Sequence, residues 1–189
     1  MNSIIDFLGA NPYKAIAVPV IGGLVSGVPL SCLKLTSGYS GNPRNALRTW
    51  YPTLRKPAFN PPNWIFPPTW TLLYVTMGYS SHLVARVAIE TLSEPRYLLA
   101  RSALGIYVAQ LSVNLLWTPL FFGQRNPRAS LLDIGVLWGL VASMTWMFGE
   151  VDQTAGLLCL PYLAWLGFAS YLNYSIVKLN PDDGIDKTK

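Results

Sequence analysis

The chain has 189 residues, enough for one domain, but 51% of them are hydrophobic and only 12% are charged, against about 25% charged residues in soluble domains. This composition excludes an ordinary soluble domain and favours a lipid bilayer as the solvent. The net charge of +5 does not indicate nucleic acid as a partner, because the Lys and Arg residues are spread over the predicted loops and form no basic and aromatic stripe.

Five apolar stretches are long enough to cross about 30 Å of hydrocarbon, which takes about 20 helical residues. They are residues 15–33, 64–85, 102–124, 129–149 and 153–177. The sequence therefore predicts an all-α integral membrane protein, a single domain built as a five-transmembrane-helix bundle. A lid-like loop at 34–63 and a short tail at 178–189 complete the predicted chain.

The basic residues predict the orientation of this bundle. With five spans, the first loop, the third loop and the C-terminal tail share one side of the membrane and carry ten of the 14 Lys and Arg residues. The positive-inside tendency places this side in the cytosol. The N-terminal segment contains Asp6 and no basic region ahead of its apolar residues, so we expect no cleaved signal and a first span that stays in the protein.

The loop at 34–63 is long, and loops of this length are usually functional or disordered. Its segment LRTWYPTL places Leu47, Trp50, Tyr51 and Leu54 on one face of a short helix. Two interpretations remain open. The segment is either a lid that lies over the bundle, or an aromatic anchor at the membrane interface.

The second span carries a stripe of aromatic and hydroxyl side chains, on which Trp70 and Tyr74 lie one helical turn apart. Its His82 is the only histidine, so neither a catalytic triad nor a two-histidine metal site is expected, and we predict a packing or interfacial role for this side chain.

The third span has a polar stripe with aromatic ends, made by Tyr107, Gln110, Asn114 and Trp117. A carboxamide facing lipid would leave its donors and acceptors unpaired, so we expect Gln110 and Asn114 to face the interior. They either bond neighbouring helices or form part of a pocket wall; the flanking aromatic residues are typical of the latter.

The fifth span places Trp165, Ala169 and Leu172 on one face. Leu172, Tyr174 and Lys178 also fit the L-x-Y-x-x-x-K pattern proposed for sterol contact, and an aromatic and basic interfacial anchor is the alternative. No metal site and no catalytic acid-base pair are predicted.

Taken together, the segments WYPTLRKPAFNPPNWIFPPTWTLLYVTMGYSSHLV, YVAQLSVNLLWTPLFFG and PYLAWLGFASYLNY closely resemble the translocator protein family, also called peripheral benzodiazepine receptors or tryptophan-rich sensory proteins. The resemblance implies a compact five-helix bundle, often a homodimer, whose pocket opens toward the first loop. It also implies protoporphyrin IX or haem-type tetrapyrroles as ligands, and sterol as a further ligand in animal members. The implied location is the mitochondrial outer membrane, or otherwise the ER or another secretory membrane.

The resemblance places the pocket residues of the family on Trp70, Asn114, Trp117 and Trp165. It places the proline-rich lid on Trp50, Leu54, Lys56, Pro57, Pro61 and Pro62. Together with the stripes described above, the predicted ligand contacts are Trp50, Leu54, Trp70, Tyr74, Tyr107, Gln110, Asn114, Trp117, Trp165 and Ala169.

The predicted function is a membrane receptor and carrier that binds a porphyrin as ligand, with no resident cofactor and no conventional enzymatic activity. Two alternatives stay open. One is a light- and oxygen-dependent porphyrin-degrading enzyme that uses the pocket tryptophans, and the other is a structural membrane scaffold without a ligand.

Overall fold

The computed structural model describes residues 1–26 and 43–181, and all regular structure in these two ranges is helical. The elements are α1 (Asn2–Ala10), α2 (Pro12–Ser26), α3 (Pro43–Thr49), η2 (Tyr51–Thr53), η3 (Asn63–Ile65), α4 (Phe66–Glu90), α5 (Glu94–Thr118), η4 (Pro119–Gly123), α6 (Pro127–Val151) and α7 (Gln153–Leu179). The end of the first predicted span, the start of the lid-like loop and most of the tail lie outside the described residues.

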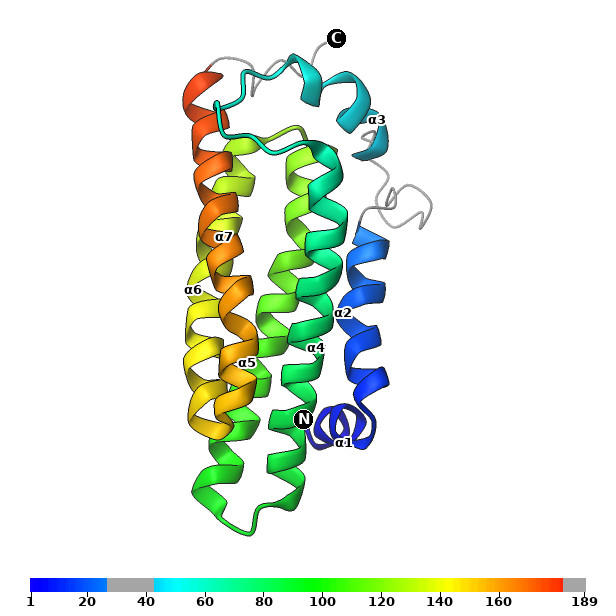
Figure 1. Ribbon diagram of the computed structural model, residues 1–189, viewed down its shortest axis with the longest axis vertical. Helices are drawn as coiled ribbons and strands as arrows, with labels where there is room; N and C mark the ends of the chain where they lie inside the picture. The colour runs from blue at the N-terminus through cyan, green and yellow to red at the C-terminus, as the bar shows by residue number, and fades with distance from the viewer. Residues whose placement is uncertain (27–42, 182–189) are drawn as a thin grey trace.

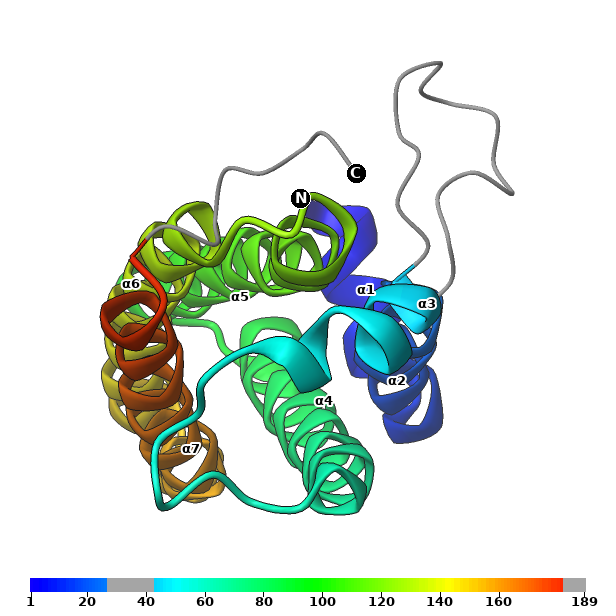
Figure 2. The ribbon, with the colours of Figure 1, turned by 90° about the horizontal axis from the view of Figure 1, so that it is seen from above.

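The long helices α4 to α7 run side by side along the long axis of the molecule, and α2 packs against α4 (Figure 1). Seen along this axis, the chain from α3 to η3 crosses one end of the bundle, passes α7 and returns to the start of α4 (Figure 2). We call residues 46–65 the lid. Helix α1 lies toward the opposite end, across the bundle axis (Figure 1).

Prolines and polar caps determine where the long helices begin. Helices α4, α5 and α6 each carry a proline in their first two positions, where a missing N–H is tolerated. The side chains of Asn126 and Asp152 cap α6 and α7 by accepting hydrogen bonds from the backbone N–H groups of Ala129 and Ala155, at 3.0 and 2.8 Å. Asp152 alone separates α6 from α7, which form a tight antiparallel hairpin.

Two of the helices extend by more than one turn beyond the predicted spans. Helix α4 continues to Glu90 rather than ending at 85, and α5 begins at Glu94 rather than at 102. Apolar runs end where the hydrocarbon ends, but a helix continues until its backbone is capped or broken. The additional turns carry the exposed ion pair between Arg86 and Glu90 and a hydrogen bond from the Arg96 guanidinium to the Val151 carbonyl, at 3.1 Å.

Helix α1 was not predicted as a separate element. Asn11, which follows it, is extended, with φ −158° and ψ 126°, because a proline at the next position disfavours the α conformation. The chain therefore turns sharply, and α1 and α2 meet at 108°.

By length and composition, three helical stretches of the described chain are suited to crossing a membrane: Glu94–Gly123, Pro127–Val151 and Gln153–Leu179. The count becomes four if the bent pair of α1 and α2 forms one span. Helix α4 is long enough but more polar, because it includes Ser80, Ser81, His82 and Arg86. The protein is thus an all-helical, multi-pass membrane protein, while the full count of five predicted spans is not confirmed.

The main core lies between α4, α5, α6 and α7. Its largest fully buried side chains include Met77, Leu104, Tyr107, Phe148 and Tyr162. A smaller cluster lies between the lid and the bundle end, and the candidate site lies between the two.

Candidate functional site

A cavity of about 310 Å³ lies beneath the lid at the end of the bundle. Residues of α2, the lid, α4, α5, α6 and α7 all contribute to its wall. The volume is at the lower end of the range of about 300 to 1,000 Å³ found for small-molecule sites. The cavity lies where the sequence places a pocket, next to the first loop.

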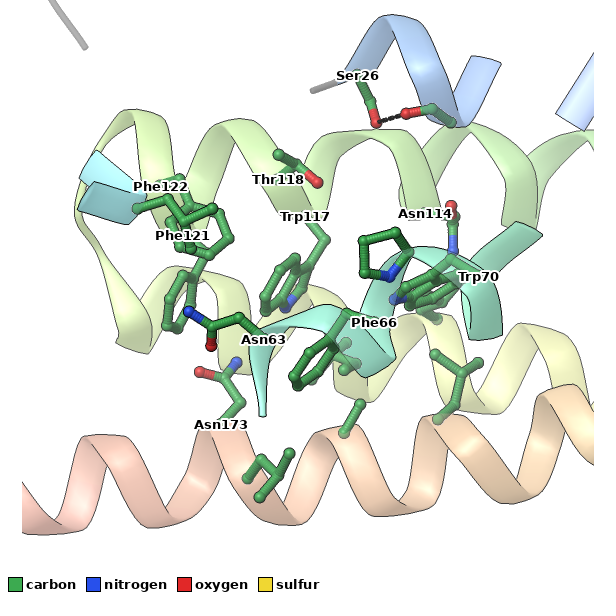
Figure 3. Close-up of a pocket in the computed structure, with 18 of the residues that line it drawn as sticks. Ser26, Asn63, Phe66, Trp70, Asn114, Trp117, Thr118, Phe121, Phe122 and Asn173 are labelled. Carbon is green, nitrogen blue, oxygen red and sulfur yellow. Dashed lines mark hydrogen bonds between the residues drawn. The ribbon is translucent and has the colours of Figure 1, made fainter. Parts of the chain in front are cut away.

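Aromatic side chains dominate the wall. In Figure 3 Trp117 lies between Phe121 and Phe122 on one side and Trp70 on the other. The rings of Trp117 and Phe121 are stacked, with 4.8 Å between their centroids and 13° between their planes. Rings stacked at this spacing contact each other directly and form a flat aromatic surface.

Phe121 reaches this position because the helix geometry changes at Pro119. The proline ring cannot continue the regular α-helical bonding of α5, and residues 119–123 form a π-helical turn in which the Gln124 N–H bonds the Pro119 carbonyl at 2.9 Å. Such turns are frequent at functional sites. Phe121 is turned inward and is 1% exposed.

The floor of the cavity is a chain of hydrogen bonds between three helices. The Tyr74 hydroxyl of α4 donates to Asn114 Oδ1 at 2.8 Å, and Asn114 Nδ2 donates to the Tyr162 hydroxyl of α7 at 3.0 Å. Tyr162 in turn donates to Gln110 Oε1 at 3.0 Å. The two amides of α5 therefore join helices, which is one of the two roles that the sequence left open, and Asn114 also lines the cavity.

The roof is the lid, which is held down by apolar contacts. Tyr51 and Leu54 are each 6% exposed and pack with Phe121 and Ile176. Trp50 meets Phe121 edge-on, with 5.6 Å between the ring centroids. These contacts favour the lid interpretation of the segment LRTWYPTL over that of an interfacial anchor.

Polar contacts fix the shape of the lid itself. The Tyr51 hydroxyl donates to Asn60 Oδ1 at 3.3 Å, and Lys56 Nζ lies 4.1 Å from the centroid of the Tyr51 ring. Burial raises the pKa of Tyr51, and the hydrogen bond to Asn60 partly opposes this shift. Partial loss of hydration lowers the pKa of Lys56.

One asparagine connects the lid to the end of α7. Asn180 Oδ1 accepts a hydrogen bond from the Arg55 N–H at 2.9 Å, and Asn180 Nδ2 donates to the Arg55 carbonyl at 2.9 Å and to the Ile176 carbonyl at 2.8 Å. Asn180 is 8% exposed. We call this arrangement the Asn180 clasp. No sequence pattern predicts this contact, because the two residues are 125 positions apart.

Two indole N–H groups near the cavity have no hydrogen-bond partner within the described chain. Nε1 of Trp117 and Nε1 of Trp165 are both buried and unpaired. A buried donor without a partner is unfavourable, and Trp117 lines the cavity. A ligand with a hydrogen-bond acceptor facing Trp117 would satisfy this donor.

The predicted contacts divide between the wall and the layer behind it. Trp70, Tyr74, Asn114, Trp117 and Ala169 line the cavity. The others pack behind or below the lining: Trp50, Leu54, Tyr107, Gln110 and Trp165.

Two residues behind the lining show how helical geometry separates stripes that look continuous in the sequence. Tyr107 is 1% exposed and packs with Phe148 in the main core. Trp165 supports the wall from outside, since its ring meets the lining residue Phe66 edge-on with 5.9 Å between centroids. Several other residues line the cavity without being among the predicted ligand contacts: Asn60, Asn63, Phe66, Phe121, Phe122 and Asn173.

The proposed sterol pattern does not form one surface. Leu172 is 5% exposed and lines the cavity, whereas Tyr174 is 53% exposed. Side chains two positions apart on a helix point in directions that differ by about 200°, at 3.6 residues per turn. Tyr174 and the exposed Lys178 therefore lie on the outer face of α7, away from Leu172. Any contact that uses all three residues would have to involve both the cavity and the lipid side.

The lining residues of the described chain include no Asp, Glu, Lys, Arg or His. Their polar groups are amides, hydroxyls and indole N–H groups, which can orient a ligand by hydrogen bonding. In the same part of the chain, no group of three or more His, Cys, Asp or Glu residues is arranged to hold a metal ion. The geometry is that of a binding site with aromatic walls, a hydrogen-bonded floor and a clasped lid.

Comparison with known proteins agrees with this architecture. The TspO/MBR family profile matches residues 15–179. The chain is 39% identical to the tryptophan-rich protein TspO of Chlorobaculum tepidum over 153 residues, which cover 79% of this chain and 92% of that protein. It is 40% identical to the translocator protein homolog of Schizosaccharomyces pombe over 155 residues, 81% of this chain and 88% of that one.

The human translocator protein is 39% identical over 131 residues, which cover 69% of this chain and 75% of the human protein. Bacterial, fungal and mammalian relatives thus align with most of the sequence at similar identity. The chain belongs to the TspO/MBR family of membrane proteins.

Proposed function

We propose that the protein is a membrane receptor and carrier for porphyrins, with protoporphyrin IX or a haem-type tetrapyrrole as its ligand and sterol as a further ligand. The observation that carries this proposal is the uncharged, aromatic-walled cavity beneath the lid, one of whose lining residues, Trp117, has a buried and unpaired N–H. The aromatic surface of the wall complements the face of a planar macrocycle, and the unpaired donor of Trp117 would be satisfied by an acceptor on its edge.

The size of the cavity adds a mechanistic step. A tetrapyrrole with its side chains is larger than the space of about 310 Å³ beneath the lid, so we expect the lid to move when the ligand enters. The Asn180 clasp and the packing of Tyr51 on Phe121 hold the lid in the closed position. Opening at this end would admit the macrocycle between Trp70 and Trp117 without separating the hydrogen-bonded floor.

The membrane arrangement follows from the same proposal. Helices α2, α4, α5, α6 and α7 each cross the bilayer, as one domain of five spans with the lid on the cytosolic side. Polar residues of α4 are tolerated because His82, Ser80 and Ser81 are buried among neighbouring helices. The protein would act as a homodimer in the mitochondrial outer membrane, or otherwise in the ER or another secretory membrane.

The test is a titration of the purified protein with protoporphyrin IX in the dark, followed by tryptophan fluorescence. We expect saturable quenching. Ala169→Phe places a ring in the cavity and should weaken binding by more than about tenfold, equivalent to about 1.4 kcal/mol. Ala164→Phe is the matched control, since Ala164 is on the same helix but exposed, and it should bind as the unmodified protein does.

Each result discriminates between function classes. A protein that folds but shows no saturable quenching would be a structural scaffold rather than a receptor. Binding by Ala169→Phe that is as tight as binding by Ala164→Phe would locate the porphyrin outside the cavity. Circular dichroism of each variant checks that the helices remain intact.

A further inference from the structure

We propose that α1 is a membrane-surface helix that lies in the plane of the bilayer, with one flank in the acyl-chain boundary and the other in water. Its partner is the lipid interface at the end of the bundle away from the lid. This inference goes beyond the proposed ligand function. The family match begins at residue 15 and does not cover α1.

The direction of α1 is the first argument. Helices α5, α6 and α7 are suited to crossing the membrane, and they run along the long axis of the molecule, whereas α1 lies across this axis (Figure 1). Helix α1 is also steeply inclined to α2, because the chain bends by 108° at Asn11. A helix perpendicular to the spanning helices lies parallel to the membrane surface.

The side chains of α1 divide into three strips. Ile5 and Leu8 are 3% and 2% exposed and face the bundle. At 3.6 residues per turn, Ile4 and Phe7 fall on one flank of this buried strip, and Asn2 and Asp6 fall on the other. All four flanking residues are exposed, so one flank of the helix is apolar and the other is polar.

Contacts show which way each flank points. On the polar flank, Asn2 Oδ1 accepts a hydrogen bond from the hydroxyl of Tyr97, in the first turn of α5, at 3.1 Å. On the apolar flank, the Phe7 ring lies 5.8 Å from Lys14 Nζ, in the first turn of α2 as that helix rises toward the lid. The polar flank therefore faces the outer end of the bundle, and Phe7 faces the hydrocarbon.

Methionine 1 supports this direction independently. A Cβ added at Gly105 would lie 3.7 Å from the Met1 methyl carbon, and Gly105 is more than two helical turns further into α5 than Tyr97. The Met1 side chain therefore extends along α5 toward the centre of the bundle, on the same side as the apolar flank.

A specific contact holds α1 at this depth. His82 Nδ1 lies 2.7 Å from the carbonyl oxygen of Leu8 and donates to it in the tautomer with the proton on Nδ1. The last carbonyls of a helix have no partner within it, so His82 satisfies one of them from α4. Gly9 allows close contact with α4, because a Cβ there would overlap the end of the Ile89 side chain.

Apolar insertion, not charge, would drive this interaction. Helix α1 contains Asp6 and no basic residue, and Lys14 follows it. An amphipathic helix at an interface buries its apolar face about 5 to 10 Å into the boundary between headgroups and acyl chains. The proposal therefore predicts the same placement in vesicles of zwitterionic phosphatidylcholine as in vesicles that contain anionic lipid.

The test attaches a nitroxide spin label to each flank of the full chain in phosphatidylcholine vesicles. Phe7→Cys and Ile4→Cys report on the apolar flank and Asp6→Cys on the polar flank, each in a background with Cys32→Ser and Cys159→Ala. Accessibility of the label to oxygen, which partitions into lipid, is compared with accessibility to a water-soluble nickel chelate. We expect the labels at positions 4 and 7 to lie about 5 to 10 Å below the headgroups, and the label at position 6 to behave as in water.

Two results would overturn the proposal. Labels at all three positions that are equally accessible to the nickel chelate would place α1 outside the membrane. Labels at positions 4 and 7 that are shielded from both reagents would indicate that protein, such as a second copy of the chain, covers this flank. Porphyrin binding in the cavity is measured separately, so failure here and failure of the proposed function are distinguishable.

Discussion

The side chain of Asn180 hydrogen-bonds both backbone groups of Arg55, at 2.9 Å in each direction, and so attaches the lid to the end of α7. The carboxamide thus forms the two hydrogen bonds that a residue of a neighbouring antiparallel β-strand would form with Arg55. This clasp is a polar contact between the lid and the bundle that a ligand entering the cavity would have to release or carry with it.

We expect Asn180→Leu to loosen the lid. The substitution leaves the N–H and carbonyl of Arg55 without these partners, and loss of a buried hydrogen bond costs about 1 to 3 kcal/mol. Amide hydrogen exchange at Arg55 should accelerate, and bound porphyrin should dissociate faster. Asn180→Asp is the control, because it keeps the acceptor for the Arg55 N–H and should give intermediate exchange. Exchange at Arg55 that is unchanged in both variants would exclude the clasp as the element that holds the lid.

We expect Trp117→Phe to affect ligand binding and stability in opposite directions. The ring stacked on Phe121 is retained in part, and the unpaired indole N–H is removed. If a ligand acceptor bonds this N–H, porphyrin affinity should fall by about tenfold. This figure corresponds to the loss of one hydrogen bond, which contributes about 1 to 1.5 kcal/mol. The melting temperature of the unliganded protein should stay the same or rise. Unchanged affinity would show that the ligand does not use this donor.

The floor of the cavity predicts a measurable coupling between Tyr74 and Asn114. Asn114→Leu and Tyr74→Phe each break the 2.8 Å hydrogen bond between the two side chains, so the double variant should lose less stability than the sum of the single variants. Between membrane helices such couplings average about 0.6 kcal/mol and reach about 1.7 kcal/mol. Thermal unfolding in detergent measures the cycle, and strict additivity would contradict the hydrogen bond.

Two glycines provide a matched test of helix packing. A Cβ at Gly78 of α4 would lie 2.6 Å from the Cα of Ile16 and 2.8 Å from the Ala15 carbonyl oxygen in α2. Backbone cannot move aside as a side chain can, so Gly78→Ala should destabilise the protein by about 1 to 3 kcal/mol. Gly135→Ala on α6 meets nothing within 4 Å and should be neutral or slightly stabilising. Equal melting temperatures for the two variants would contradict the close contact of α2 and α4.

Tryptophan variants distinguish a carrier from a porphyrin-degrading enzyme. Trp70 lines the cavity and Trp165 supports its wall. For a carrier, Trp70→Phe and Trp165→Phe should lower affinity by less than about tenfold, because phenylalanine keeps much of the ring contact, and light should destroy bound porphyrin no faster than free porphyrin. An enzyme would accelerate the loss of porphyrin absorbance under light and oxygen. In that case either variant would still bind porphyrin but would no longer accelerate its loss.

The sequence by itself determined the membrane class, the helical stretches and the family, because each depends on the residues of one segment and its neighbours. Apolar runs require helices, since a backbone in lipid must satisfy its own hydrogen bonds. Buried amides must find partners, so Gln110 and Asn114 had to face inward. Proline-rich residues at the start of α4 likewise predicted a break between the loop and the helix.

Only the tertiary structure decided which inward residues share a cavity. Asn114 lines it, while Gln110, one turn away on the same stripe, lies below it. The difference depends on where Tyr162 of α7 is placed between them. Helical periodicity in one segment carries no information about how far a neighbouring helix is shifted along the bundle axis. Two other contacts were likewise decided only by the tertiary structure: the clasp between Arg55 and Asn180, and the hydrogen bond between His82 and the Leu8 carbonyl. Each joins residues far apart in the chain, and their partners become defined only when the bundle has packed.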